Sequence, residues 1–171
     1  QALRAVDAQV DYHIPVRANE SHGVNIPVLK EIIEGGTQLL VTCDTGITAH
    51  EAIQYARNHA VDVIVTDHHD LPIGLPPAFV LVNPKFLPTD HPLAALSGVG
   101  VAYKLAEWLL SEKESGLPVS DLVDLAALGL ISDLAPLVND SRYLAQMGIR
   151  ALRENKRPGL ASLFDAAELI P

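Results

Sequence analysis

The stretch VDVIVTDHHD, residues 61–70, places a short apolar run directly before two histidines that acidic residues flank. The run Val61–Thr66 is rich in β-branched residues, and its length is typical of a buried strand. The four polar residues that follow would then leave that strand at its carboxyl end. Because ligands of open α/β sheets bind at this edge, the stretch predicts both a strand and a site.

Segments on both sides of this strand alternate between strand patterns and helix patterns. Nearly continuous apolar strands imply burial on both faces. We therefore predict an α/β fold with a parallel sheet flanked by helices. The predicted strands are Val10–Pro15, Gln38–Thr42, Val61–Thr66 and Ala78–Val82, and the predicted helices between them are Pro27–Glu34 and Ala49–Asn58.

From Gly98 onward the sequence becomes mainly helical. Ser120 is the expected N-cap of a helix in this half, and Lys113–Pro118 is the expected flexible connection. We expect one domain over residues 1–171. The predicted helices are Val99–Leu110, Ser120–Ile131 and Ser141–Arg153.

Composition favours a compact intracellular protein. About half of the 171 residues are hydrophobic, and Cys43 is the only cysteine, which excludes an intrachain disulfide. The first residues, QALRAVDAQVDYHIP, resemble neither a signal peptide nor a membrane span. The expected location is the cytoplasm, without a membrane partner.

The acidic charge balance argues against a module that coats nucleic acid. The formal net charge is −9 and the pI is near 5.1. A nuclease is still compatible with this balance, because a metal site needs carboxylates and another domain can supply a basic groove. One local basic patch, which we interpret as a solvated helix face, comprises Arg150, Arg153, Lys156 and Arg157.

Asp44 follows the apolar run that ends at Val41 and precedes Thr45-Gly46-Ile47, where a helix is about to open. Alone, it is explained as a helix cap or a turn residue. The same position after the next strand carries Asp67 and His68, however, and neighbouring parallel strands lie about 5 Å apart. The spacing therefore suits a shared metal ion, while Cys43 should point the opposite way, into the core.

Asp133 is a carboxylate in the otherwise apolar stretch AALGLISDLAPL, residues 126–137. Burying it without a partner would be costly, and a metal, helix-end amides or a cation could each relieve that cost. The company of Asp44 and His68 favours a metal. These ligand types suit manganese, magnesium with waters, iron or zinc, whereas the lack of cysteine ligands disfavours a structural zinc site.

The glycine-rich stretch SGVGVAYK, residues 97–104, opens a helix. Free amides there, near Ser97, Gly98 and Gly100, could hold a phosphate of the substrate. Close packing of a helix against a strand explains the glycines equally well, so both interpretations stay open. We interpret the histidines at 13, 22, 50, 59 and 91 as ordinary polar residues.

Four segments in order, VTCDTGI (41–47), VIVTDHH (63–69), SGVGVAYKL (97–105) and LGLISDLAPL (128–137), resemble the DHH phosphoesterase superfamily. Within it, the chain resembles the RecJ-type single-strand-specific exonucleases. The resemblance implies a two-metal site, usually with manganese and otherwise with magnesium. Asp44 is similar to the carboxylate that bridges the ions, and His68 and Asp133 match metal ligands. Asp67 looks like a supporting residue, and His69 looks like a residue that either faces the phosphate or supports a metal ligand from behind.

The resemblance also implies a reaction, in which metal-activated water hydrolyses phosphodiesters. Its implied form is 5′ to 3′ degradation of single-stranded DNA in recombination and repair, with a single-strand-binding protein and a helicase as partners. Two other functions remain open. One is a phosphoesterase for short oligonucleotides, cyclic dinucleotides or pyrophosphate, and the other is a non-catalytic scaffold.

The chain departs from the family pattern at both ends. The family's first motif, Asp-x-Asp-Gly, has no counterpart here, and its substrate-binding domains would lie beyond Pro171. We therefore expect residues 1–171 to form a partial DHH domain that is inactive or very weak alone.

Overall fold

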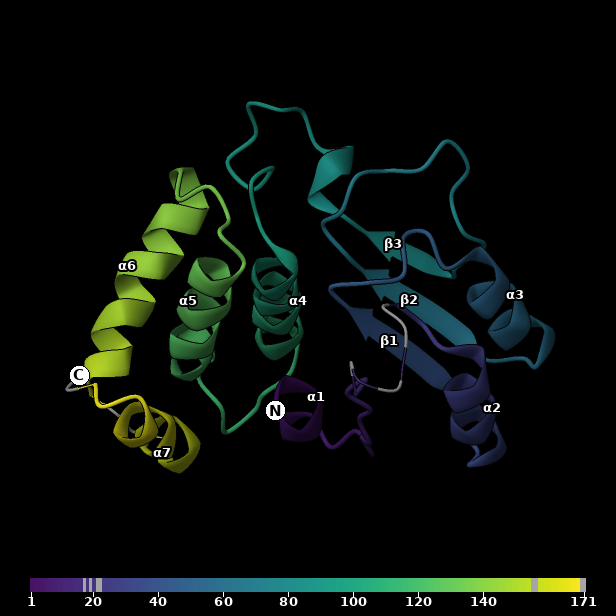
Figure 1. The fold of residues 1–171 in the computed structure, drawn as a ribbon, viewed down its shortest axis with the longest axis horizontal. Coiled ribbons are helices and arrows are strands. Elements are labelled where there is room, and N and C mark those ends of the chain that lie inside the picture. The colour runs from purple at the N-terminus through teal and green to yellow at the C-terminus, as the bar shows by residue number, and fades with distance from the viewer. Residues whose placement is uncertain (17, 19, 21–22, 155–156, 170–171) are drawn as a thin grey trace.

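The computed structural model describes residues 1–16, 18, 20, 23–154 and 157–169 (Figure 1). Its sheet has three parallel strands in the order β1-β2-β3, with Cys43 beside Thr66 and Thr66 beside Val82 in the register. The prediction of a parallel sheet flanked by helices, followed by a mainly helical half, is confirmed. The strands are β1 Leu39–Cys43, β2 Asp62–Thr66 and β3 Val80–Val82.

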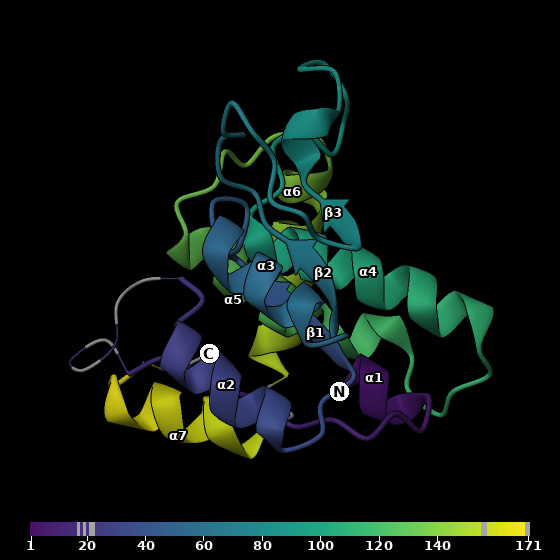
Figure 2. The ribbon, with the colours of Figure 1, turned by 90° about the vertical axis from the view of Figure 1, so that its right-hand side faces the viewer.

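Helices surround the sheet and build the second half of the chain. The pair α2 and α3 lies on one side of the strands, and α4 separates the sheet from α5 and α6 (Figure 1). Figure 2 looks from the α2–α3 side. The helices are α1 Ala2–Ala5, α2 Ile26–Glu34, α3 His50–Asn58, α4 Gly98–Glu112, α5 Val123–Ser132, α6 Asn139–Arg153 and α7 Pro158–Ala166, with 3-10 turns η1 Pro84–Phe86 and η2 Val119–Leu122.

A first apolar cluster fastens α2 and α3 to one face of the sheet. The side chain of Asn25 caps α2 by accepting from the Val28 amide, and Leu29 is buried beneath. The α3 residues Ala52, Ile53 and Ala56 share one buried face, as their spacing predicts. This packing holds β1 and β2 in place below their carboxyl ends. The cluster comprises Leu29, Ala52, Ile53, Ala56, Val61, Val63 and Val65.

A second apolar cluster joins α4, α5 and α6. Gly148 lets α6 approach α5 closely, because a Cβ there would lie 2.2 Å from the Ala127 Cβ and 2.3 Å from the Val123 carbonyl oxygen. The cluster fixes α5, whose last turn leads to Asp133, relative to α4. Its members are Leu96, Val101, Tyr103, Leu122, Val123, Ala126, Leu130 and Leu144.

The predicted strand Val10–Pro15 is wrong for this structure. The segment forms no ladder, and Tyr12 and Ile14 are 78% and 73% exposed. Alternating polarity does not suffice for a strand, because backbone N–H and C=O groups need a neighbouring strand as partner. Among the described residues, no segment pairs with the free edge of β1.

Several helix boundaries also differ from prediction. Ser120 is not an N-cap, because Val119–Leu122 forms a 3-10 turn after Pro118 and α5 begins only at Val123. The helix α7 was missed; it starts at Pro158, a residue well suited to a first helical position. No helix in the described part of the chain is both long enough and apolar enough to span a membrane.

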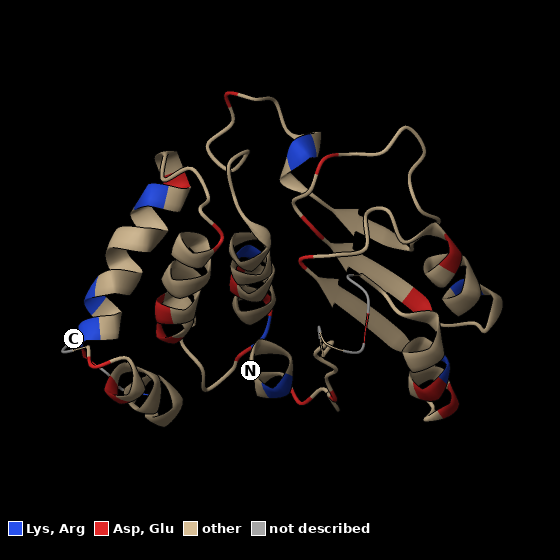
Figure 3. Ribbon diagram, in the orientation of Figure 1, with Lys and Arg blue, Asp and Glu red and all other residues tan. Residues whose placement is uncertain are grey.

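The basic patch is only partly a solvated face. Arg150 and Arg153 are exposed and lie in the last turn of α6. Figure 3 shows basic positions in blue toward the end of this helix. Arg157 is half-buried instead, and its Nε lies 2.5 Å from Oδ2 of buried Asp124. Arg157 also donates to the Asp121 carbonyl, so it joins the start of α7 to η2 and α5. Lys156 lies outside the described residues.

Candidate metal centre

Asp44 leaves β1 at the edge where β2 also ends. Its amide donates to the Thr66 carbonyl at 2.9 Å, which extends the parallel pairing one residue beyond Cys43. Asp44 then turns the chain through a left-handed conformation with φ of 63°, which aspartate adopts more readily than most residues. The turn presents the Asp44 carboxylate to the segment that follows β2.

His68 is the centre of a cluster drawn from three elements. Its Nε2 lies 2.9 Å from Asp44 Oδ1 and 3.7 Å from Oδ2 of Asp133, the residue that ends α5. One ligand atom from each of Asp44, His68 and His69 fits within 4.8 Å. Carboxylate oxygens and imidazole nitrogens at this spacing fit manganese, magnesium with waters, iron or zinc. The structure thus places both predicted carboxylate ligands, Asp44 and Asp133, near His68, but the group that fits within 4.8 Å contains His69 and not Asp133.

Two expectations about burial near this cluster are wrong. The Asp133 side chain is 37% exposed, so no burial cost has to be relieved there. The apolar neighbours in sequence suggested burial, but Asp133 is the C-cap of α5 and its side chain is exposed to solvent. Cys43 is exposed rather than buried in the core.

Asp67 is the buried support of the cluster, with 1% of its surface exposed. Its Oδ2 accepts from the Ile47 amide at 2.9 Å, which ties β2 to the turn after Asp44. Its Oδ1 accepts from the amides of His68 and His69 at 2.8 and 3.2 Å. Burial alone would raise the pKa of Asp67, but these donors outweigh it and lower the pKa below its ordinary value.

His69 is held by Asp67 rather than by Asp44 or Asp133, the carboxylates predicted to bind metal. Its Nδ1 lies 2.6 Å from Asp67 Oδ1, and its side chain is 60% exposed. The hydrogen bond to Asp67 raises the pKa of His69 despite partial burial, and the charges of Asp44 and Asp133 add to the effect. The imidazole is therefore oriented and favoured as a cation.

Asn83 supports the site, although no motif in the sequence marked it. Its buried amide donates to the His69 carbonyl at 3.0 Å, and its Oδ1 accepts from the Lys85 amide at 2.8 Å. It thereby links the turn after β3 to the turn after β2. The only signal in the sequence was a polar residue before Pro84, directly after a strand.

The glycine-rich loop lies beside the cluster. A cavity of about 320 Å³ is lined by Ser97 and Gly98 together with Asp44 and Asp133. Gly98 packs against Asp44, since a Cβ on it would lie 2.3 Å from Asp44 Oδ1. Gly100 does not line the cavity, and its missing side chain makes room for Leu96 instead. The remaining lining residues are Val99, Gly129 and Ser132.

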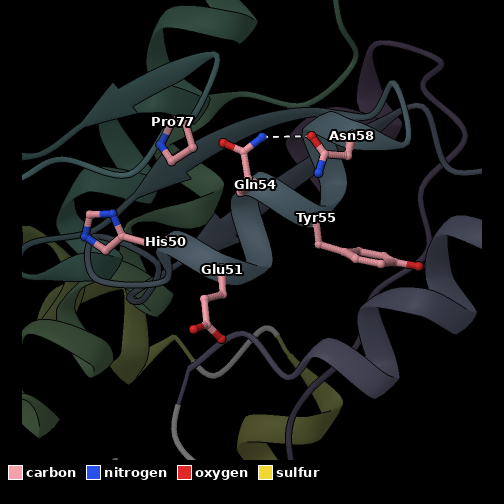
Figure 4. A pocket seen from close by; sticks show the side chains of 6 residues that line it. All are labelled: His50, Glu51, Gln54, Tyr55, Asn58 and Pro77. Carbon is pink, nitrogen blue, oxygen red and sulfur yellow. Dashed lines mark hydrogen bonds between the residues drawn. The ribbon is translucent and has the colours of Figure 1, made fainter.

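A larger hollow of about 520 Å³ lies over the exposed face of α3 and Pro77. Its side chains point in different directions (Figure 4), and among those drawn only Gln54 and Asn58 are hydrogen-bonded, at 2.8 Å. His50, at its rim, fits the interpretation as an ordinary polar residue. The polar groups there do not converge on a common point, as those of a ligand site do.

We expect Asp67→Asn to destabilise the metal-free protein by about 2–3 kcal/mol near neutral pH, because an amide cannot accept at both positions. Because the pKa of Asp67 is lowered on folding, this residue contributes to the free energy of unfolding above its unfolded-state pKa. That contribution is lost as the pH falls through its folded-state pKa. The pKa of His69 is raised on folding, so its contribution to the free energy of unfolding is present at low pH and is lost as the pH rises through its folded-state pKa.

Denaturant unfolding of both proteins across pH 2–9 measures this difference. The difference in free energy of unfolding between the wild type and Asp67→Asn should be largest between the folded-state pKa values of Asp67 and His69. It should decrease at acid pH and, to a lesser extent, at alkaline pH. Asp70→Asn is the matched control, because Asp70 lies in the same segment with its side chain 95% exposed. A difference that does not vary with pH would contradict the ionised pairing of Asp67.

The chain is similar in sequence to a known family of proteins and to several of its members. Residues 1–130 match the model of the DHH family, N-terminal domain. The chain is 43% identical to the single-stranded-DNA-specific exonuclease RecJ of Bacillus subtilis, over 95% of the chain and 20% of that protein. It is 37% identical to RecJ of Haemophilus influenzae, over 97% of the chain and 31% of that protein.

Solved structures show the same likeness. A crystal structure of exonuclease RecJ bound to manganese superposes with a TM-score of 0.83 and 36% identity, over 96% of this chain and 42% of that one. RecJ of Thermus thermophilus in complex with Mn²⁺ superposes with a TM-score of 0.72 and 35% identity, over 85% of this chain and 22% of that one. The chain spans a fifth to a third of the curated relatives named above. Since the family model matches well over half of its residues, the chain belongs to the DHH family.

Proposed function

We propose that this chain carries the metal-binding part of an exonuclease that degrades single-stranded DNA from its 5′ end. The observation that carries the proposal is the convergence of Asp44 and Asp133 on His68 Nε2, at 2.9 and 3.7 Å. The names of the similar RecJ proteins, which are single-stranded-DNA-specific exonucleases, support the substrate. The polarity of degradation rests on the family resemblance.

In this proposal Asp44, His68 and Asp133 hold Mn²⁺ or Mg²⁺. Two such ions would supply an activated water and stabilise the leaving oxygen of the phosphodiester. The fit is supported by the donor set, since carboxylate and imidazole are ligands that manganese accepts, and by the manganese in the similar RecJ structures.

The two residues beside the ligands have separate proposed roles. His69, oriented by Asp67 and with a raised pKa, faces the phosphate as a hydrogen-bond donor and positive charge. Asp67 acts through His69 and through the Ile47 amide, so it is a positioning residue. The acidity of the chain, with a net charge of −9, is consistent with a site whose ligands collect cations.

We further propose a cytoplasmic location and cooperation with a single-strand-binding protein and a helicase. The single cysteine and the absence of a membrane-spanning helix among the described residues are consistent with this location. The partners rest on the repair role that the family resemblance implies. That residues 1–171 form only part of a DHH domain also stays a prediction.

The test is a comparison of substrates with Mn²⁺ and the protein at its full natural length. We expect a long 5′-labelled single strand to release labelled mononucleotides first, while the matching duplex is left intact. Release of label only from dinucleotides would favour a phosphoesterase for short substrates. Metal binding without hydrolysis of any of these substrates would favour the scaffold.

A further inference from the structure

The N-terminus of α4 presents backbone amides beside the proposed metal cluster that have no acceptor within the helix. The first amide of this helix with an intrahelical acceptor is that of Val101, which donates to the Ser97 carbonyl at 3.0 Å. The amides of Gly98, Val99 and Gly100 precede it and have no acceptor within the helix. They also carry the positive end of a 15-residue helix dipole.

Ser97 stands at the N-cap position of α4 without using its side chain as a cap. Serine is favoured there because its hydroxyl oxygen accepts from the first turn of the helix. Here the hydroxyl is buried and has no hydrogen-bond partner among the described residues, and Ser97 as a whole is 1% exposed. A buried hydroxyl without a partner costs stability, so its presence needs an explanation.

The cavity of about 320 Å³ connects these donors to the metal cluster. Ser97, Gly98 and Val99 form one part of its lining, and Asp44 and Asp133 form another. Gly98 packs directly against the Asp44 carboxylate, so the helix N-terminus and the ligand side chain share one space. Gly100 is outside the lining and packs against Leu96, which leaves Ser97, Gly98 and Val99 as the donors that can reach a ligand.

We propose that the Ser97 hydroxyl and the amides of Gly98 and Val99 bind a non-bridging oxygen of the substrate phosphate. This inference rests on the proposed function, because it assigns the phosphate of that reaction to a place. Cations held by Asp44 and Asp133 offset the repulsion between these carboxylates and an anion, so phosphate binding depends on the metal. The phosphate thus lies between the cations and the positive end of α4.

The variant Ser97→Ala tests this subsite in the protein at its full natural length. Four quantities are measured: the affinity for inorganic phosphate in Mg²⁺ and the affinity for Mn²⁺, both by calorimetry, the KM for single-stranded DNA in Mn²⁺, and the denaturant midpoint. We expect phosphate affinity to fall and KM to rise, each about 10-fold, as for one lost hydrogen bond to a charged group. The midpoint should stay the same or rise, because the unpartnered hydroxyl is gone, and Mn²⁺ affinity should not change.

Ser132→Ala is the matched control. Ser132 lines the same cavity, but its hydroxyl already donates to the Leu128 carbonyl. Removing it should leave phosphate affinity unchanged. If Ser97→Ala fails to fold, Ser97→Cys keeps nearly the same shape with a weaker donor and should show the same loss of phosphate affinity.

A lower denaturant midpoint for Ser97→Ala, with phosphate affinity and KM unchanged, would overturn the proposal, since Ser97 would then cap α4. The phosphate subsite and the exonuclease function can be refuted independently of each other. Wild-type protein that digests single strands while Ser97→Ala has an unchanged KM and phosphate affinity refutes only the subsite. Wild-type protein that binds phosphate through Ser97 but digests no single strand refutes only the exonuclease.

Discussion

Asp44→Asn is expected to abolish Mn²⁺-dependent digestion of single-stranded DNA and to lower Mn²⁺ affinity at least 100-fold. Asp44 Oδ1 lies 2.9 Å from His68 Nε2, so the variant removes a proposed carboxylate ligand next to the centre of the cluster. Loss of a group that only supports a ligand already costs about 10–100-fold in metal affinity or activity, and loss of a ligand should cost more. Calorimetry with Mn²⁺ and a digestion assay measure the two effects.

Asparagine is the sharper replacement, because Asp44 has a φ of 63°. Asparagine tolerates this conformation, whereas alanine would add backbone strain to the loss of the ligand. The control is Asp62→Asn, which removes an exposed carboxylate from the opposite end of the same sheet. If Asp44→Asn digests DNA as fast as the wild type, the proposed metal site is wrong, whereas the exonuclease activity itself would stand.

Gly98→Ala is expected to lower Mn²⁺ affinity and the rate of digestion by about 100-fold, although it replaces no proposed metal ligand. A Cβ on residue 98 would lie 2.3 Å from Asp44 Oδ1 and 2.7 Å from the Asp44 Cβ and Cγ. The backbone of Asp44 is held in place, because its amide donates to the Thr66 carbonyl and the turn that follows has a left-handed conformation. Either α4 or the carboxylate must move, and a displacement of about 1 Å at a reacting centre costs on the order of 100-fold.

The matched control for Gly98→Ala is Gly159→Ala. Both glycines lie in the first turn of a helix, but a Cβ on Gly159 would meet no atom within 4 Å. Helix propensity favours alanine over glycine by about 1 kcal/mol, so Gly159→Ala should be neutral or stabilising. A Gly98→Ala protein with wild-type Mn²⁺ affinity would show that the contact between α4 and Asp44 is not needed for the site.

Local chemistry made much of the site predictable. Apolar β-branched runs followed at once by Asp44 and by Asp67-His68-His69 require only that strands be parallel and adjacent, and the register of Cys43 with Thr66 meets that requirement. The wrong predictions share a different cause. Val10–Pro15 has the alternation of a strand without a partner strand, and Cys43 and Asp133 were assigned to buried surroundings from their sequence neighbours alone.

The sequence by itself determined the parallel α/β architecture, the helical second half and the edge of the sheet that carries the proposed metal ligands. Periodicity and strand-end residues are local properties, so they can be recognised along the chain. Only the tertiary structure decided that Gly98 makes room for Asp44 whereas Gly100 makes room for Leu96, and that the Ser97 hydroxyl is buried without a partner. These facts depend on distances between segments far apart in sequence, and the packing of α4 against the sheet sets those distances.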